Sequence, residues 1–538
     1  MNITGWQTRL LVPRWRSLAM TTASGELGSV SAPPRPVSAR TNQDFLVHLE
    51  RWQLSPALIT AAELIEAAIL AAREKDAIAA ARLILDDQSN AAPLLKAQAA
   101  SLLLRAGLGE DVPEQHRKKD PLDGTKTRRM LRLHPRDGLA WVELAFAQTV
   151  AGHPRSAEKS MDVALKLSPH NRHVLRSASR LYLHLGFKDK AHDLLARNAA
   201  TRTDPWLVAA EIALAAVAER NPRFYKAALG LLDNTSFSPH HLTELAGAAG
   251  TQELFAGSRK KAKRLFLQSV IAPTGSSLAQ AEWATPSLGV EIIEKHKAST
   301  ATEPYEADAF HLYREGRFSE VPASCENWAK VEPFSIRPFE FGSIAAGNAE
   351  LFDKAIDLAG EGLRRRPTSP RLLNSFAFAL ASLDRVSEAA EALRKVSLEE
   401  VEPQFKFLTL ANMGLMSFRE GKLEDGVRFY REAIEGFAKT GFRQSSATAR
   451  VYLAREGLKA NLPNAKQLVN EAQEAMRSFP AIEASRLLRK IQLAVGEKPN
   501  DLPAHITPPD LEHSAKPAPL PTPEIKWTTP GWKGLSSR

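Results

Sequence analysis

The sequence is short of the residues and patterns that most chemical sites require. Its 538 residues contain a single cysteine, Cys325. One cysteine excludes an internal disulfide and any multi-cysteine zinc or iron–sulfur site, which fits a reducing compartment and makes the cytoplasm the expected location. Apolar runs of the roughly 18 residues that a membrane span needs are also missing. We therefore expect no association with a membrane.

Motifs that carry enzyme chemistry are missing as well. The chain has no glycine-rich phosphate loop, no His-Glu-x2-His zinc helix and no Gly-x-Ser-x-Gly nucleophile elbow. The one adjacent histidine pair, His240 and His241, follows Pro239 at an expected helix start and is interpreted as solvent-facing. Cys325 falls at a spacing expected to face a helix-pair core, where a thiol is inert. These absences predict a protein that is not an enzyme and needs no cofactor or metal.

Positive charge is in mild excess and is spread along the chain. The 71 basic and 61 acidic residues give a formal net charge of +10. A dedicated nucleic-acid binder usually concentrates such charge on one face, often interleaved with aromatic residues. The basic runs are therefore interpreted as solvated helix faces or helix ends, with phosphate contact as the alternative, and they occur at Arg117–Lys119, Lys126–Arg129, Arg259–Arg264 and Arg364–Arg366.

The start of the chain lacks helical periodicity. Residues 21–40 are rich in Ser, Thr, Gly and Pro, and residues 1–43 carry five arginines and have Glu26 as their one acidic residue. This composition predicts a disordered basic extension. The arginine-rich, acid-poor first residues also resemble an organelle transit peptide, and Met20 offers an alternative start.

The end of the chain is dominated by proline. Residues 499–538 are expected to be disordered because recurring prolines prevent a helix. Trp527 and Trp532 lie near the end of this tail, where they would be left in water unless they dock. We therefore predict a short linear motif that inserts into a partner or into this protein's own groove, with simple exposure as the alternative.

Between these ends, small residues and prolines recur at a fixed spacing. From Phe45 to about Val495 the apolar residues follow helical periodicity, without a convincing strand pattern. Prolines and alanines recur 34 residues apart, in the pairs Pro135 and Pro169, Pro333 and Pro367, Ala157 and Ala191, and Ala355 and Ala389. Five residues before the second-helix small position lies a residue that tolerates a tight turn: Gly152, Gly186, Gly316 and Asp384. Repeated helix pairs explain this spacing, because the turn needs left-handed geometry and small side chains let two helices approach closely.

The clearest unit contains Trp141, Leu144, Ala145, Gln148, Gly152, Ala157, Met161, Ala164 and Pro169. This pattern resembles the tetratricopeptide repeat (TPR) family, whose units carry Trp-x2-Leu-Gly-x2-Tyr followed by spaced alanines and a proline. The resemblance implies an all-α, right-handed superhelical solenoid of about ten to twelve TPR-like helix pairs. We expect one block over residues 44–275, an atypical connection over 276–304 and a second block over 305–498.

The resemblance also implies a function. TPR solenoids bind another protein or a peptide in a groove lined by the first helix of each pair, so we expect a non-catalytic scaffold or adaptor. A nucleic-acid-associated factor that uses basic helix faces and a peptide-responsive regulator remain the alternatives. The candidate partner-binding residues lie off the expected core face of two such helices. They are His173, Arg176, Arg180, Arg371, Asn374 and Phe378. Arginine suits this role because its forked donors match carboxylates, whereas a solvated polar face is the alternative interpretation.

Overall fold

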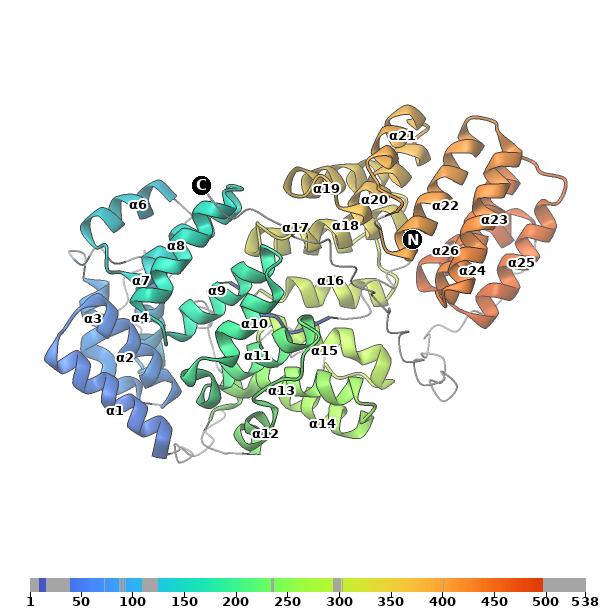
Figure 1. The fold of residues 1–538 in the computed structure, drawn as a ribbon. Helices are drawn as coiled ribbons and strands as arrows, with labels where there is room; N and C mark the ends of the chain where they lie inside the picture. Colours follow the sequence, from blue (N-terminus) through green and yellow to red (C-terminus); the bar gives the residue numbers. More distant parts are fainter. Residues whose placement is uncertain are drawn as a thin grey trace, which may run out of the picture.

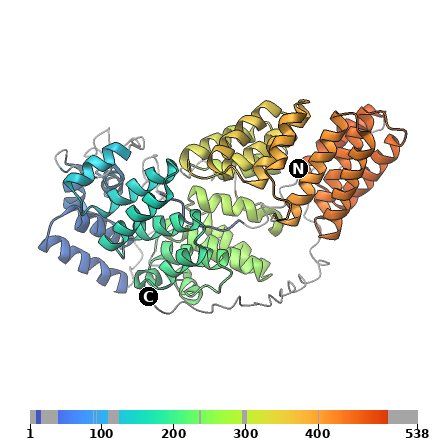
Figure 2. The ribbon, with the colours of Figure 1, turned by 45° about the horizontal axis from the view of Figure 1, so that its top comes forward.

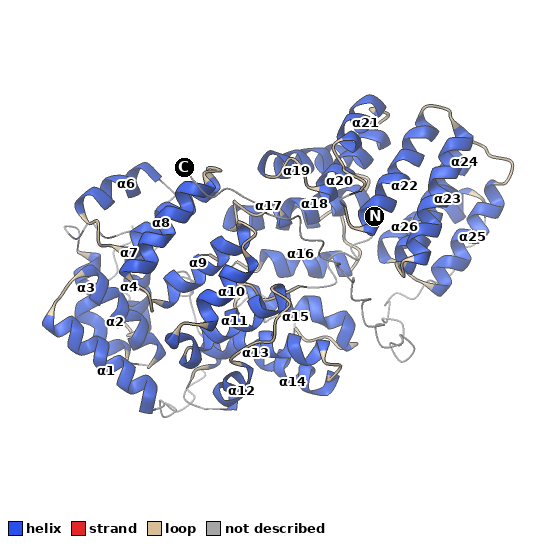
Figure 3. Ribbon diagram, viewed as in Figure 1, coloured by secondary structure: helices blue, strands red, loops and turns tan. Residues whose placement is uncertain are grey.

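The computed structural model describes residues 9–15, 39–71, 73–86, 89, 91, 93–108, 124–233, 237–293, 301, 303–399 and 401–496. Within these ranges all regular secondary structure is helical and there is no strand (Figure 3). Within the described ranges, consecutive helices pack against each other from α1 to α4 and from α6 to α26, and α4 packs against α7. The helices therefore form one curved stack that runs from α1 at one end to α26 at the other (Figures 1 and 2). The predicted all-α solenoid of stacked helix pairs is confirmed.

The first part of the stack contains the helices up to α14. Their bounds are α1 (Ala39–Leu54), α2 (Leu58–Leu70), η3 (Glu74–Ala77), α3 (Ile78–Leu85), α4 (Pro93–Arg105), α6 (Gly124–Leu133), α7 (Gly138–Val150), α8 (Pro154–Leu167), α9 (Arg172–His184), α10 (Lys188–Ala196), η6 (Ala199–Thr203), α11 (Pro205–Val217), α12 (Tyr225–Asp233), α13 (Pro239–Phe255) and α14 (Arg259–Ser269). The helical region was expected to start at residue 44, and α1, the first helix in the described ranges, begins at Ala39.

The remaining helices continue the stack. They are α15 (Gly275–Leu288), α16 (Tyr305–Arg314), α17 (Val321–Val331), α18 (Arg337–Asn348), α19 (Phe352–Arg365), α20 (Pro370–Ser382), α21 (Val386–Arg394), α22 (Pro403–Arg419), α23 (Leu423–Lys439), α24 (Arg443–Lys459), α25 (Ala465–Ser478) and α26 (Ile482–Ala494). The segment expected to be an atypical connection, 276–304, contributes α15, a helix that packs against α13, α14 and α16. The stacking thus passes through this segment.

The turns explain the 34-residue spacing. Gly152, Gly186, Gly316 and Asp384 all have positive φ, at 76°, 86°, 72° and 59°. Each lies between the two helices of a pair, where a left-handed residue lets the chain reverse direction. The alanines Ala157, Ala191, Ala355 and Ala389 are completely buried. The prediction of a left-handed turn followed by a close helix approach is confirmed at these positions.

The two helices of a pair differ in how they are buried. In the first helices, burial extends over nearly every face: all residues from Arg172 to Tyr182 of α9 and from Pro205 to Ala215 of α11 are buried. In the second helix α8, only one face is buried, with Ala157, Ser160, Met161 and Ala164. A one-sided apolar stripe is typical of a surface helix. The first helices therefore form the inner layer, which is where charged residues meet in the candidate site.

Phe334 brings two distant parts of the stack together. It lies between α17 and α18, yet its ring packs against Phe146 of α7 at a centroid distance of 5.8 Å and against His184 of α9 at 5.3 Å. The stack therefore curves back on itself, so that α7 and α9 face the loop before α18.

Candidate peptide-binding site

A short extended segment near the start of the chain, Arg9–Trp15, lies against this inner layer. We call it the strap. Arg9, Leu11, Pro13 and Trp15 are buried, and the residues between them are only partly covered. Alternate burial with a period of two is the pattern of an extended chain with one face against a surface. The structure thus places an ordered peptide where the sequence predicted part of a disordered extension.

The guanidinium group of Arg9 is held by side chains from two helices. Its Nε and Nη2 donate hydrogen bonds to Oε1 and Oε2 of Glu306 on α16, at 3.0 and 2.8 Å. Its Nη1 donates to Oε1 of Gln280 on α15. The amide Nε2 of Gln280 in turn donates to the carbonyl oxygen of Arg9 at 2.7 Å. Glu306 and Gln280 therefore recognise both the side chain and the backbone of one strap residue.

Glu306 is a buried carboxylate with three arginine partners. Its side chain is inaccessible to solvent and makes ion pairs with Arg9 (2.8 Å), Arg14 (2.5 Å) and Arg337 (2.6 Å). Burial alone would raise the pKa of Glu306, but the charges of Arg337, Arg9 and Arg14 outweigh it and hold the pKa well below its usual value. The carboxylate is thus ionised near neutral pH, and two of its three cationic partners come from the strap.

Leu11 occupies a space left by a glycine. A Cβ atom added at Gly247 of α13 would lie 2.8 Å from Cδ1 of Leu11. A side chain at this position would force the Leu11 side chain to shift, because such a distance is shorter than a van der Waals contact. Gly247 therefore makes room for an apolar strap residue.

Trp15 completes an aromatic cluster at the other end of the strap. Its ring lies edge-on to Phe146 at 5.2 Å and to Phe334 at 5.7 Å. The guanidinium of Arg180 lies over the Phe334 ring at 4.8 Å. Burial, followed by the charge of Arg180, lowers the pKa of the neighbouring His184 to about 4. Edge-to-face rings and a cation over a ring each add a specific orientation to the apolar contact.

The three candidate residues of α9 are buried, and Arg180 shares the Phe334 ring with Trp15 of the strap. His173, Arg176 and Arg180 are 1%, 2% and 8% exposed. Arg176 donates to Oε2 of Glu244 at 2.7 Å and to the carbonyl oxygen of Trp206 at 2.9 Å. The shared face expected from helical spacing is therefore directed inward, and within the described chain Arg176 is already bound to α13.

The three candidate residues of α20 lie in the second half of the stack. Arg371 is 3.8 Å from the carboxylate of Glu340, and its guanidinium lies over the ring of Phe405. Asn374 is fully buried, and its Oδ1 accepts a hydrogen bond from Nδ2 of Asn412 at 2.9 Å. Phe378 packs edge-on to Tyr452 at 5.5 Å. The structure does not bring these residues together with those of α9.

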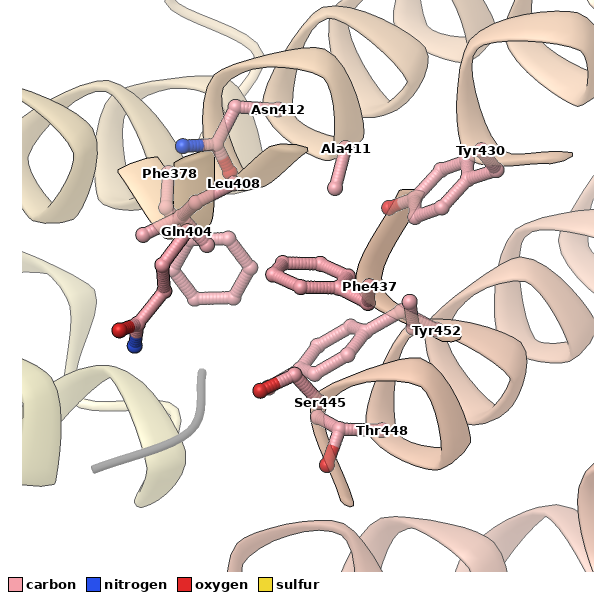
Figure 4. Close-up of a pocket in the computed structure, with 11 residues that line it drawn as sticks. Phe378, Gln404, Leu408, Ala411, Asn412, Tyr430, Phe437, Ser445, Thr448 and Tyr452 are labelled. Carbon is pink, nitrogen blue, oxygen red and sulfur yellow. The ribbon is translucent and has the colours of Figure 1, made fainter. Parts of the chain in front are cut away.

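Phe378 lines a pocket between α20, α22, α23 and α24 (Figure 4). The pocket contains about 530 Å³ of empty space, part of which is open to solvent. Its lining includes the aromatic residues Phe378, Tyr430, Phe437 and Tyr452, together with Leu408 and Thr448. Oγ1 of Thr448 is buried without a hydrogen-bond partner in the described structure. This pocket is neutral, in contrast to the strap site.

The remaining predicted features divide between surface and undescribed residues. Trp527 and Trp532 and the run Arg117–Lys119 lie outside the described residues. On α14, the basic run Arg259–Arg264 is mostly exposed, and Lys261 pairs with Glu253. Arg365 donates to the carbonyl oxygens of Pro333 and Glu361, which fits the expected helix-end role.

One cluster has the composition of a metal site. Glu282, Glu291 and His311 place ligand atoms within 4.8 Å of one another. However, Arg314 donates to both carboxylates, at 3.0 Å to Glu282 and at 2.9 and 3.0 Å to Glu291. The positive charge that these carboxylates need is supplied by the arginine.

Burial raises the pKa of the Cys325 thiol, so this cysteine is poorly suited as a metal ligand or nucleophile.

Sequence reasoning missed the strap, although a signal for it was present. Residues 9–15 read Arg-Leu-Leu-Val-Pro-Arg-Trp, an apolar stretch with arginine at both ends and an aromatic residue last. Such a stretch is unusual for a disordered extension, which is typically poor in apolar and aromatic residues. Its partners Gln280 and Glu306 are more than 270 residues away and cannot be paired with it by local periodicity.

Comparisons with known proteins provide little further information. No protein-family model matches the sequence, and no curated protein matches it. Among solved structures, the chain is similar to one titled "Crystal structure of APC/C hetero-tetramer Cut9-Hcn1", with 12% identity over 84% of this chain and 93% of that chain. The TM-score is 0.33. Similarity at this level does not extend to function, which has to be argued from the residues themselves. None of the described helices has the length and apolarity to span a membrane.

Proposed function

We propose that this protein is a non-catalytic scaffold or adaptor of the TPR type, located in the cytoplasm, that binds a segment of a partner protein on its inner helix layer. The observation that carries the proposal is the strap. Seven consecutive residues, 9–15, lie extended against α7, α13, α15 and α16, with alternate side chains buried. This layer is therefore able to hold an extended peptide through specific side-chain contacts.

A second candidate function rests on α14. Arg259, Lys260, Lys263 and Arg264 are exposed on one helix, where they could contact phosphate groups. Binding of this kind depends on counterion release and falls steeply as the salt concentration rises. A peptide-responsive regulator is compatible with the first proposal, since a bound peptide could alter the curvature of the stack.

The test is co-purification from the native organism at physiological salt, with and without nuclease. The full chain is compared with two variants: Gly247→Leu, which fills the space beside Leu11, and a quadruple charge reversal of the exposed α14 residues. We expect a stoichiometric, nuclease-resistant partner whose retention depends on Gly247 and not on α14. Loss of all co-purifying material on nuclease treatment, or in the α14 variant alone, would favour the nucleic-acid function.

A further inference from the structure

The strap site contains buried polar groups that require a particular kind of occupant. If the strap left, Glu306 would keep only Arg337 of its three ion-pair partners. Gln280 would lose its acceptor contact with the Arg9 side chain and its donor contact with the Arg9 carbonyl, and would keep the hydrogen bond from its Nε2 to Oγ1 of Thr251. A buried carboxylate and a buried amide are costly when their partners are missing. The site therefore favours an extended chain that offers an arginine and a backbone carbonyl at this point.

The strap itself satisfies this site incompletely. Arg180 is 8% exposed, and its Nε makes no hydrogen bond within the described residues; the same holds for Nε1 of Trp15 beside it. Both atoms lie at the aromatic end of the site, where the Phe334 ring contacts both side chains. An occupant that placed a carbonyl or carboxylate oxygen here would pair with Nε of Arg180, a donor of the site that the strap leaves without a hydrogen bond in the described structure. This deficit points to a different ligand that fits the same site better.

We propose that the strap site recognises an extended segment of a partner protein with three features, and that the strap competes with it as a resident ligand. The features are an arginine for Glu306 and Gln280, an apolar residue two positions later for Gly247, and an aromatic residue six positions after the arginine for Phe146 and Phe334. This proposal rests on the proposed function and specifies its ligand. Covalent attachment gives the strap a high local concentration, so the partner segment has to displace the strap and binds more weakly than it would bind to the empty site.

The test uses the full chain, folded with its strap in place. A specific protease site is inserted between Trp15 and Ala39, so that cleavage turns the strap into a separate peptide that dialysis removes. The probe is a fluorescein-labelled synthetic peptide with the sequence of residues 7–17, followed by fluorescence anisotropy. We expect the cleaved protein to bind the probe at least tenfold more tightly than the uncleaved protein.

Matched probe peptides test the specificity. Leu11→Glu places a charge against Gly247, whereas Leu10→Glu changes the neighbouring, partly exposed residue. We expect Arg9→Glu and Leu11→Glu to weaken binding at least tenfold and Leu10→Glu to weaken it much less. Equal binding of all four peptides would overturn the proposal, because the site would not read these side chains.

Two other outcomes would also contradict it. If the cleaved protein keeps its helical circular dichroism but never exchanges its strap for the probe, the strap is a permanent part of the fold. If light scattering shows that the uncleaved chain is a dimer and that removal of the cleaved strap converts it to a monomer, the strap fills the site of a second copy and competition does not occur within one chain. Failure here is distinguishable from failure of the proposed function, because a partner retained equally by the full chain and by Gly247→Leu would bind elsewhere on the solenoid.

Discussion

The strap site and the pocket beside Phe378 are two regions of one solenoid that differ in charge, in what fills them and in the sequence separation of the residues that form them. The strap site is filled by a charged peptide, whereas the pocket is neutral and its lining includes four aromatic rings. Arg9 and Glu306 are separated by 297 residues in the sequence, whereas Asn374 and Asn412 beside the pocket are separated by 38. The first site depends on the curvature of the whole stack. The second depends only on the packing of adjacent repeats.

The largest expected difference between the two regions comes from Glu306. Replacing it by Gln leaves Arg9, Arg14 and Arg337 without their carboxylate, and breaking a buried ion pair in this way typically costs about 3–5 kcal/mol of stability. We expect a corresponding shift in the urea midpoint. The matched control is Glu320→Gln, which removes the exposed partner of Arg317 and should leave the midpoint unchanged. Equal stability of the two variants would show that the ion-pair cluster does not stabilise the fold.

Replacing Asn374 tests the pocket region, and the expected loss of stability is smaller than for Glu306. The Asn374→Ala variant removes the Oδ1 acceptor that Nδ2 of Asn412 and Oγ1 of Thr409 use. Loss of a buried hydrogen-bond partner costs about 1–3 kcal/mol. Because these contacts join adjacent repeats, hydrogen exchange should speed up in α20 and α22 and stay unchanged in α7 and α9. Faster exchange along the whole stack would mean that the two regions unfold as one unit.

The same contrast between local and distant contacts explains which parts of these regions could be predicted from the sequence. The 34-residue spacing was sufficient to locate the turns at Gly152 and Asp384, because each helix pair repeats a local pattern. It was not sufficient to place His173, Arg176 or Arg180, since helical spacing identifies a shared face without showing what covers it. That cover includes Glu244 of α13 and Phe334 before α18, which reach α9 only through the curvature of the stack. The position of the strap could not be predicted for the same reason, because its partner helices also reach it only through the curvature of the stack.

His184 should give the strap region a pH dependence in a defined window. Its folded-state pKa is lowered to about 4 by burial and by the charges of Arg180 and Arg366, compared with the ordinary 6.5. A histidine with a lowered pKa contributes stability that is complete above pH 6.5 and is lost as the pH falls toward 4. Glu306, whose pKa is also lowered, contributes a further loss only below its ordinary value of 4.5.

The measurement is the urea midpoint of the wild-type protein between pH 7 and pH 4.5. We expect a decline over this interval that His184→Gln makes shallower. The matched control is His153→Gln, at an exposed position in the turn between α7 and α8, which should leave the decline in place. A decline of the same slope in the His184→Gln variant would assign the pH dependence to other groups.

Replacing Trp15 should give the smallest change in global stability. This small effect would distinguish the strap from the solenoid core. Trp15 and Phe378 are similarly buried, at 4% and 6% exposure. Phe378→Ala leaves a cavity between helices that cannot move apart freely, with an expected cost of about 3–5 kcal/mol. In the Trp15→Ala variant the strap can instead detach from Phe146 and Phe334 while the helices stay packed. We therefore expect little change in the urea midpoint and faster proteolysis within residues 9–15. If Trp15→Ala lowers the midpoint as much as Phe378→Ala does, the strap belongs to the folding core and cannot act as a displaceable ligand.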